Sequence, residues 1–84
     1  MSRSLLVTGA AGFIGANFVH YWSAKCPEDR IVVLDALTYA GNITNLAGLD
    51  RGSDYHFVHG DIADFELLSA LFAEHGINSV VHFA

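Results

Sequence analysis

The sequence predicts an α/β fold: a parallel sheet of about four strands, doubly wound by helices on both faces. Three observations support this. Short apolar runs rich in Val, Ile and Leu recur along the chain, segments with helical apolar spacing lie between them, and glycines join the first run to the first helix. Strands that alternate with helices pair in parallel through right-handed crossovers. We expect the strand order 3-2-1-4, which is common among such sheets.

The first half of the chain supplies two predicted strands and one helix. Residues 5–7 form an apolar run that ends in glycines, as expected of a strand buried on both faces. A helix is predicted over residues 13–25, where the apolar side chains that recur on one helix face are Ile14, Phe18, Tyr21 and Trp22. Residues 31–34 give a second apolar run, and Asp35 stands at its end.

The second half begins with a connection and then returns to the alternation of strand and helix. Residues 36–54 are rich in Gly, Asn and Thr and are predicted to be mostly a connection, with a short helix over 43–49. A third strand is predicted over residues 55–59 and a fourth over 79–83.

A second helix is predicted between the third and fourth strands. Its N-cap is either Asp61 or Asp64, because an aspartate there accepts hydrogen bonds from the first unpaired amides. Gly76 is placed to end the helix, since glycine adopts the left-handed conformation of a helix C-terminus without strain. The side chains expected to mark one side are Phe65, Leu68, Leu71, Phe72 and His75.

Composition limits the partners of the protein. The formal net charge is −5 and the four basic residues are scattered, so we expect no nucleic-acid and no membrane partner. No apolar run reaches the length of a membrane span or a signal-peptide core, so we expect a cytoplasmic protein. The single cysteine, Cys26, excludes an internal disulfide and a thiolate zinc cluster, and the histidines lie on separate elements or opposite strand faces. We expect no metal site.

A glycine-rich loop joins the first predicted strand to the first helix. Its glycines, Gly9, Gly12 and Gly15, are similar in context to the phosphate-binding fingerprint of Rossmann-type sheets, although the first spacing is one residue wider. Gly9 permits the tight turn, Gly12 lets the backbone approach a pyrophosphate, and Gly15 lets the helix pack on the sheet. The unpaired amides of the first helical turn, near Phe13 and Ile14, then face the anion.

Asp35 predicts which dinucleotide the loop binds. It lies about 20 residues beyond the loop, where the fingerprint has a carboxylate that accepts hydrogen bonds from the ribose hydroxyls. The same carboxylate would repel a 2′-phosphate, and residues 36–38 include no arginine to compensate. NAD is therefore the expected cofactor, in preference to NADP.

Asp61 and Ile62 follow the third strand and have two interpretations. A carboxylate and an apolar side chain at this strand end could flank the adenine of the dinucleotide. Asp61 could also be a helix N-cap. Both interpretations stay open, with adenine binding slightly favoured because this strand end opens toward the same crevice.

The loop T-G-x-x-G-x-x-G at residues 8–15 resembles that of the extended short-chain dehydrogenase/reductase family. Residues 34–42, Leu-Asp-Ala-Leu-Thr-Tyr-Ala-Gly-Asn, and residues 57–62, Phe-Val-His-Gly-Asp-Ile, are similar to the members that dehydrate dTDP-glucose at carbons 4 and 6. The ending Val-Val-His-Phe-Ala at residues 80–84 resembles the family's fourth strand. The resemblance covers nearly the whole chain but only the first quarter of such an enzyme.

The resemblance implies further cofactor contacts and a reaction. Leu37 and Thr38 would meet the adenosine ribose and nearby groups, and Phe83 and Ala84 the far half of NAD. NAD would store a hydride while sugar C4 is oxidised and water leaves across C5 and C6, and the hydride would return to C6. The expected substrate is a nucleotide sugar, dTDP-glucose, the product is a 4-keto-6-deoxy sugar nucleotide, and the whole enzyme is expected to be a homodimer.

No catalytic residue is assigned within this chain. The family's tyrosine belongs to a Tyr-x-x-x-Lys pair on a much later helix, and its acid/base carboxylates also lie downstream. Tyr21 and Lys25 match the letters of that pair, but they follow the glycine loop directly, so we expect Tyr21 in the core and a solvated Lys25. The sequence stops within or just after a strand, which predicts an N-terminal fragment that is inactive and marginally folded by itself.

Two alternatives remain open. One is another enzyme of the same family, such as a nucleotide-sugar 4-epimerase, which the downstream catalytic carboxylates would distinguish. The other is a non-catalytic dinucleotide-binding module, whose parent sequence would lack a true Tyr-x-x-x-Lys pair.

Overall fold

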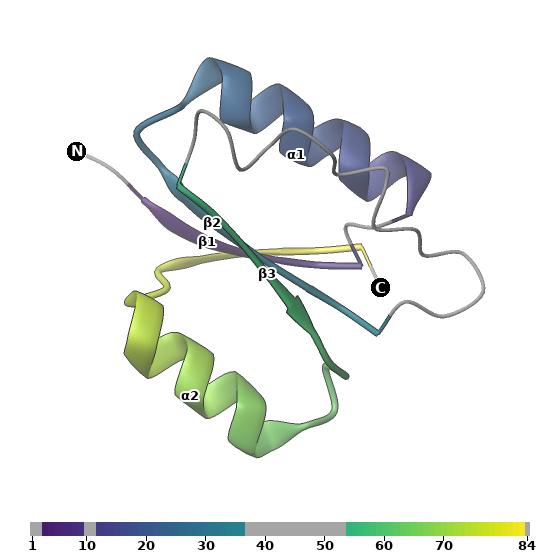
Figure 1. The fold of residues 1–84 in the computed structure, drawn as a ribbon, viewed down its shortest axis with the longest axis vertical. Coiled ribbons are helices and arrows are strands. Elements are labelled where there is room, and N and C mark those ends of the chain that lie inside the picture. Colours follow the sequence, from purple (N-terminus) through teal and green to yellow (C-terminus); the bar gives the residue numbers. More distant parts are fainter. Residues whose placement is uncertain (1–2, 10–11, 37–53, 84) are drawn as a thin grey trace.

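The computed structural model describes residues 3–9, 12–36 and 54–83. Within these ranges strands and helices alternate as predicted, whereas the helix expected over residues 43–49 falls outside them. Figure 1 shows a central twisted sheet with helix α1 on one face and helix α2 on the other. Neither helix in the described part is long and apolar enough to cross a membrane.

The sheet has the predicted doubly wound topology. Its strands are β1 (Ser4–Thr8), β2 (Arg30–Asp35), β3 (Tyr55–His59) and β4 (Ser79–His82). All neighbours pair in parallel in the order β3-β2-β1-β4, which confirms the predicted order 3-2-1-4. The carboxyl ends of all four strands therefore meet at one edge of the sheet, where ligands bind in open α/β sheets.

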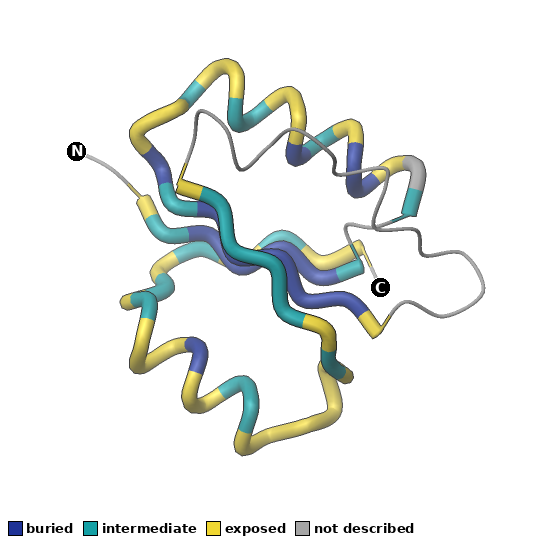
Figure 2. Tube along the Cα trace, in the orientation of Figure 1, coloured by how far each residue is buried: buried dark blue, intermediate teal, exposed yellow. Residues whose placement is uncertain are grey.

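The two central strands form the core. Their side chains divide between two clusters, because successive side chains of a strand point to opposite faces. The cluster beneath α1 consists of Leu5, Val7, Ala16, Val19, Ile31 and Val33. The cluster beneath α2 consists of Leu6, Val32, Leu34 and Leu71. Figure 2 shows that burial is concentrated in β1 and β2, while the outer strands are mostly half-buried or exposed.

Helix α1 (Phe13–Lys25) has the predicted bounds but a different buried face. The prediction of an apolar face is wrong for Ile14 and Tyr21, which are 71% and 59% exposed. The side chains buried against the sheet belong to Ala16 and Val19, and the predicted residues that do pack partly against this cluster are Phe18 and Trp22. Small side chains bring the helix close to the sheet, so larger residues lie at the flanks of the contact.

Helix α2 (Phe65–His75) begins and ends at predicted signals. Asp64 is the N-cap, and its Oδ1 accepts a hydrogen bond from the amide of Leu67 at 3.1 Å. Gly76 follows the helix in the left-handed conformation with φ 60°, and its amide donates to the carbonyl of Phe72 at 3.0 Å. These contacts confirm the Asp64 alternative for the cap and Gly76 as the stop.

The face of α2 that contacts the sheet differs in part from the prediction. Leu71 is buried, and Leu67 and Leu68 pack beside it against the core. The prediction is wrong for Phe65 and Phe72, which are 78% and 42% exposed. Spacing alone predicts an apolar stripe, but the line of contact passes through the three leucines because the crossing of the helix over the sheet selects it.

Candidate functional site

The glycine loop lies at the carboxyl end of β1, where the chain turns toward α1. Gly9 has φ 71°, in the left-handed region that residues with a Cβ adopt only at a cost. Its amide donates to the carbonyl of Leu34 at 3.0 Å, which ties this corner to β2. Helix α1 begins after Gly12, whose carbonyl accepts from the amide of Ala16 at 2.9 Å. The described ends of the loop are thus held by backbone hydrogen bonds.

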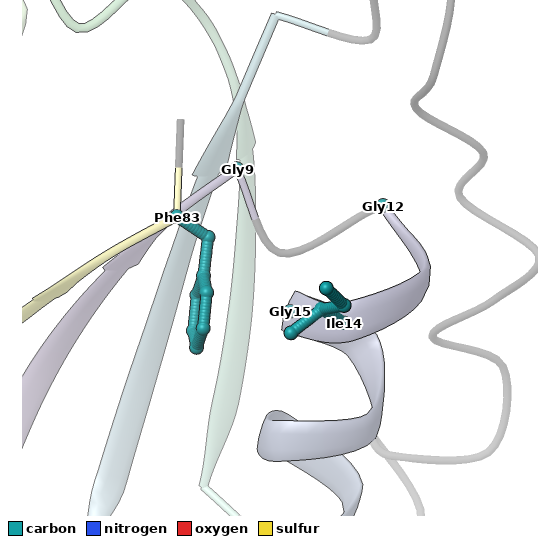
Figure 3. Close-up of a pocket in the computed structure, with 5 residues that line it drawn as sticks. All are labelled: Gly9, Gly12, Ile14, Gly15 and Phe83. Atoms are coloured by element: carbon teal, nitrogen blue, oxygen red, sulfur yellow. The ribbon is translucent and has the colours of Figure 1, made fainter.

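A pocket of about 290 Å³ opens between the start of α1 and the end of β4. In Figure 3 the ring of Phe83 extends from the chain just after β4 and lies across from Ile14 on the first turn of α1. The residues that line the pocket are Gly9, Gly12, Ile14, Gly15 and Phe83. Three of these five are glycines, so much of the wall is peptide backbone with apolar side chains on either side.

Gly12 keeps space in this pocket that the fold itself does not require. Its φ of −73° is one that any residue can adopt. Among the described residues other than its two chain neighbours, the nearest neighbour of a Cβ at Gly12 would be the carbonyl oxygen of Gly9 at 3.6 Å, which is ordinary van der Waals contact. The chain would therefore accept a small side chain here, and the glycine leaves this space available to a ligand.

The first turn of α1 is open to an anion. Gly12 supplies no side-chain cap, and the turn contains no acidic residue. The first amides of a helix have no carbonyl partner within the helix, and together they carry a partial positive charge. A helix start of this kind that borders a pocket with backbone walls is suited to bind phosphate groups.

Phe83 is supported by a contact that the sequence analysis missed. Its ring centroid lies 5.6 Å from that of Phe18, with the two rings tilted by 53°. Phe18 also stacks on Trp22, at 5.9 Å between centroids. Helical spacing indicated that Phe18 is buried, but its partner directly follows β4, more than sixty residues later, and no local sequence signal identifies it.

Asp35 and Asp61 lie at the carboxyl ends of β2 and β3, at the same edge as the pocket but outside its lining. Asp35 is only 9% exposed, and its carbonyl accepts from the amide of Gly60 at 3.1 Å. Oδ1 of Asp61 accepts from the amide of Ala63 at 2.8 Å, which closes a turn. Because Asp64 caps α2, the cap interpretation of Asp61 is wrong, and the adenine interpretation stays a prediction.

The other predicted contacts divide into those the structure places and those it does not describe. Ile62 is 39% exposed next to Asp61. Leu37, Thr38 and Ala84 lie outside the described residues, as does the side chain of Phe13, the first residue of α1. The structure therefore brings five predicted residues into one pocket, namely Gly9, Gly12, Ile14, Gly15 and Phe83.

Tyr21 does not pack in the core, contrary to the prediction. Its exposed ring lies 5.8 Å from Nζ of Lys25, a cation–π contact on the surface of α1. Neither residue lines the pocket.

Within the described ranges, one electrostatic pair with a clear effect on a pKa lies at the opposite edge of the sheet. Nε of Arg30 donates to Asp54 at 2.9 Å and lowers the pKa of that carboxyl. Partial burial opposes this shift, and a second hydrogen bond, from Nε2 of His56 at 2.7 Å, adds to it. Over the described ranges, His, Cys, Asp and Glu side chains form no group of three that could hold a metal ion.

Comparison with known proteins gives consistent matches. A family model described as GDP-mannose 4,6 dehydratase matches residues 6–84. The chain is 54% identical over 80 residues to a dTDP-glucose 4,6-dehydratase of Mycobacterium tuberculosis, covering 95% of this chain and 23% of that protein. It is 52% identical over 79 residues to one from Xanthomonas campestris, covering 94% and 22%. The chain thus spans about a quarter of the length of these relatives.

Solved structures agree with the sequence matches. The dTDP-glucose 4,6-dehydratase of Bacillus anthracis, crystallised in complex with NAD, superposes with a TM-score of 0.93 at 43% identity, covering 98% of this chain and 26% of that one. The UDP-glucose 4-epimerase of Thermotoga maritima, crystallised with UDP-glucose, superposes with a TM-score of 0.81 at 32% identity, covering 98% and 24%.

Proposed function

The chain belongs to the GDP-mannose 4,6 dehydratase family, and from this membership we propose that it is the NAD-binding N-terminal part of a nucleotide-sugar 4,6-dehydratase. The observation that carries the proposal is the uncapped start of α1 beside a pocket with glycine walls. Peptide amides of this kind bind a pyrophosphate without a counter-charge from side chains. The space left at Gly12 fits the same ligand, because the fold alone does not need a glycine there.

We assign the cofactor contacts from the positions of the residues. The amides at the start of α1 would hold the pyrophosphate, and the side chains of Ile14 and Phe83 would flank the dinucleotide on its two sides. Bound NAD would supply a reversible hydride acceptor. The contribution of this chain is to bind and orient the dinucleotide at the carboxyl edge of the sheet.

Asp35 would select NAD over NADP. It ends β2 at the cofactor edge, where a carboxylate can accept hydrogen bonds from the ribose hydroxyls. A 2′-phosphate would meet the negative charge of the same group. Asp61 and Ile62, at the end of the neighbouring strand, would flank the adenine.

For the full-length protein we propose the conversion of dTDP-glucose to dTDP-4-keto-6-deoxyglucose, a lyase reaction in which water is lost. The sequence similarity to dTDP-glucose 4,6-dehydratases supports this reaction over 4-epimerisation, because identity to the epimerase is lower. We also propose that the full-length protein is a cytoplasmic homodimer. The net charge of −5 supports the expectation that it has no nucleic-acid partner.

The test is a titration of the full-length protein with NAD and with NADP, followed by product analysis with dTDP-glucose. We expect NAD to bind on the order of tenfold or more tightly than NADP, because one uncompensated charge repulsion separates them. Asp35→Asn, which removes the charge and keeps the size, should narrow that difference. Equal affinity for the two cofactors in the unchanged protein would refute the role of Asp35. A C4 epimer as the product would refute the dehydratase assignment.

A further inference from the structure

The two outer strands of the sheet both end in a histidine at the cofactor edge. His59 is the last residue of β3 and pairs in register with Asp35 at the end of β2. His82 is the last residue of β4 and pairs with Thr8 at the end of β1. Each imidazole makes a hydrogen bond inward to the neighbouring central strand or to the residue that follows it. This arrangement is repeated on the two sides of the sheet.

The bond of His82 joins two side chains. Nδ1 of His82 lies 2.6 Å from Oγ1 of Thr8, and the hydroxyl can give or take the hydrogen. Thr8 is only 1% exposed, so this hydroxyl is shielded from water as a competing partner. The next residue, Phe83, donates its amide to the carbonyl of Thr8 at 2.9 Å and lines the pocket. The bond therefore fixes the strand end from which Phe83 extends.

The bond of His59 joins a side chain to the backbone. Nε2 of His59 lies 3.0 Å from the carbonyl oxygen of Ala36, which can only accept, so the imidazole donates. Ala36 directly follows Asp35, and the carbonyl of Asp35 accepts from the amide of Gly60. Gly60 leads into Asp61. This bond therefore ties together the two strand ends that carry the predicted adenosine contacts.

We propose that His59 and His82 are positioning residues of the cofactor site: His59 holds the end that would bind adenosine, and His82 holds the end from which Phe83 flanks the other half of the dinucleotide. This inference rests on the proposed NAD-binding function. It predicts that substitutions of the two histidines affect different ligands, because each histidine acts through a different part of the site. A general loss of stability would instead weaken both AMP and NAD in variants of either histidine, whereas the positioning role of His82 predicts that its variant weakens NAD and spares AMP.

Amide side chains test the two bonds separately. Asparagine places a polar atom near the position of Nδ1, and glutamine reaches near the position of Nε2. In the full-length protein, His82→Asn should preserve the bond to Thr8 and His82→Gln should lose it. At the other strand the order reverses: His59→Gln should preserve the bond to the Ala36 carbonyl and His59→Asn should lose it. The Asn and Gln variants at each position carry the same polar group, so a difference between them reports whether that group reaches the position of the hydrogen bond.

Affinities for NAD and for AMP are measured at a temperature at which circular dichroism shows every variant folded. Loss of one hydrogen bond corresponds to about a two- to tenfold change. We expect His59→Asn to weaken AMP and NAD alike. His82→Gln should weaken NAD and leave AMP unchanged, and the two preserving variants should bind like the unchanged protein.

Each outcome decides between the proposals. Suppose that the unchanged protein binds NAD. If all four variants then bind NAD with the same affinity as the unchanged protein, or if His82→Gln weakens AMP as much as NAD, the positioning roles are wrong and the proposed function stands. If the unchanged protein binds neither NAD nor AMP, the proposed function is wrong and the inference falls with it.

Discussion

The two helices that the structure describes begin at the same edge of the sheet, and they differ in whether a side chain caps their first amides. Helix α2 is capped by the carboxylate of Asp64 and has Glu66 in its first turn. Helix α1 has neither a side-chain cap nor an acidic residue there. A cap contributes about 1 kcal/mol to helix stability, so α1 gives up a stabilisation that α2 keeps. The helix start without a side-chain cap is the one that borders the pocket.

The comparison shows how a fold of this class reserves a binding site. In the first turn of α2 the amide of Leu67 has a side-chain acceptor, and Glu66 would repel an incoming phosphate. In α1 the N-cap residue is a glycine, which supplies no such acceptor and adds no side chain to the approach. A residue that gives α1 a cap should therefore close the site, and loss of the cap of α2 should cost only stability.

The largest effect is expected from Gly12→Asp, which gives α1 the kind of cap that α2 has. The new carboxylate would compete for the first amides and repel the pyrophosphate, so the affinity of the full-length protein for NAD should fall about 100-fold or more. Isothermal titration calorimetry measures it. Gly12→Asn is the matched control, since it adds the same bulk without charge and should weaken NAD less. Wild-type affinity in Gly12→Asp would contradict the assignment of the pyrophosphate to α1.

Asp64→Ala makes the opposite change at α2. Removal of the cap leaves the amide of Leu67 without its side-chain acceptor and should lower the free energy of unfolding by about 0.5–2 kcal/mol. Chemical denaturation measures the loss, and NAD affinity should stay unchanged. Asp64→Asn retains a capping oxygen and serves as the control. The comparison would fail if Asp64→Ala weakened NAD binding as strongly as Gly12→Asp.

Gly76→Ala tests the far end of α2, where no ligand role is proposed. The residue has φ 60°, and a Cβ there would meet no described residue within 4 Å, so the expected cost is conformational. We expect a loss of about 1 kcal/mol from the left-handed conformation, again without effect on NAD. Gly76→Asn should cost less, because asparagine tolerates this conformation better. A loss in Gly76→Asn as large as in Gly76→Ala would argue against a purely conformational cost.

The smallest effect concerns pH and the edge opposite the pocket. Hydrogen bonding from Arg30 lowers the pKa of Asp54 below 3.8, so its contribution to stability is complete above that value and disappears as the pH falls through the lower folded-state pKa. The carboxyl is largely exposed, so the contribution is small. Asp54→Asn should make the decline in stability between pH 5 and pH 3 slightly shallower in denaturation curves. A steeper decline would show that the sign is wrong.

The strand order was predicted from the alternation of strands and helices and from the order that is common among such sheets. Local signals predicted the bounds of α1, the Gly76 stop and, as one of two alternatives, the Asp64 cap. Each of these local signals depends on residues close together along the chain, such as an aspartate before an apolar run or a glycine after it. The buried faces were harder to predict. Ile14 and Phe65 fit the helical spacing, yet both are exposed, because the sheet and not the helix selects the line of contact.

Part of the candidate site was also predictable from local sequence, and part was not. Gly9, Gly12 and Gly15 are recognisable because one short loop contains them all. The support of Phe83 by Phe18 and the bond between Thr8 and His82 join segments far apart in the sequence. These contacts follow from the pairing of β1 with β4, which a pattern within either segment does not encode.

The most direct test of the central claim is amide hydrogen exchange of the full-length protein with and without NAD, read by mass spectrometry. NAD should slow exchange in peptides that cover residues 12–16, at the start of α1, and leave peptides that cover residues 66–72 of α2 unchanged. Binding of NAD with no added protection over residues 12–16 would contradict the claim that these amides hold its pyrophosphate.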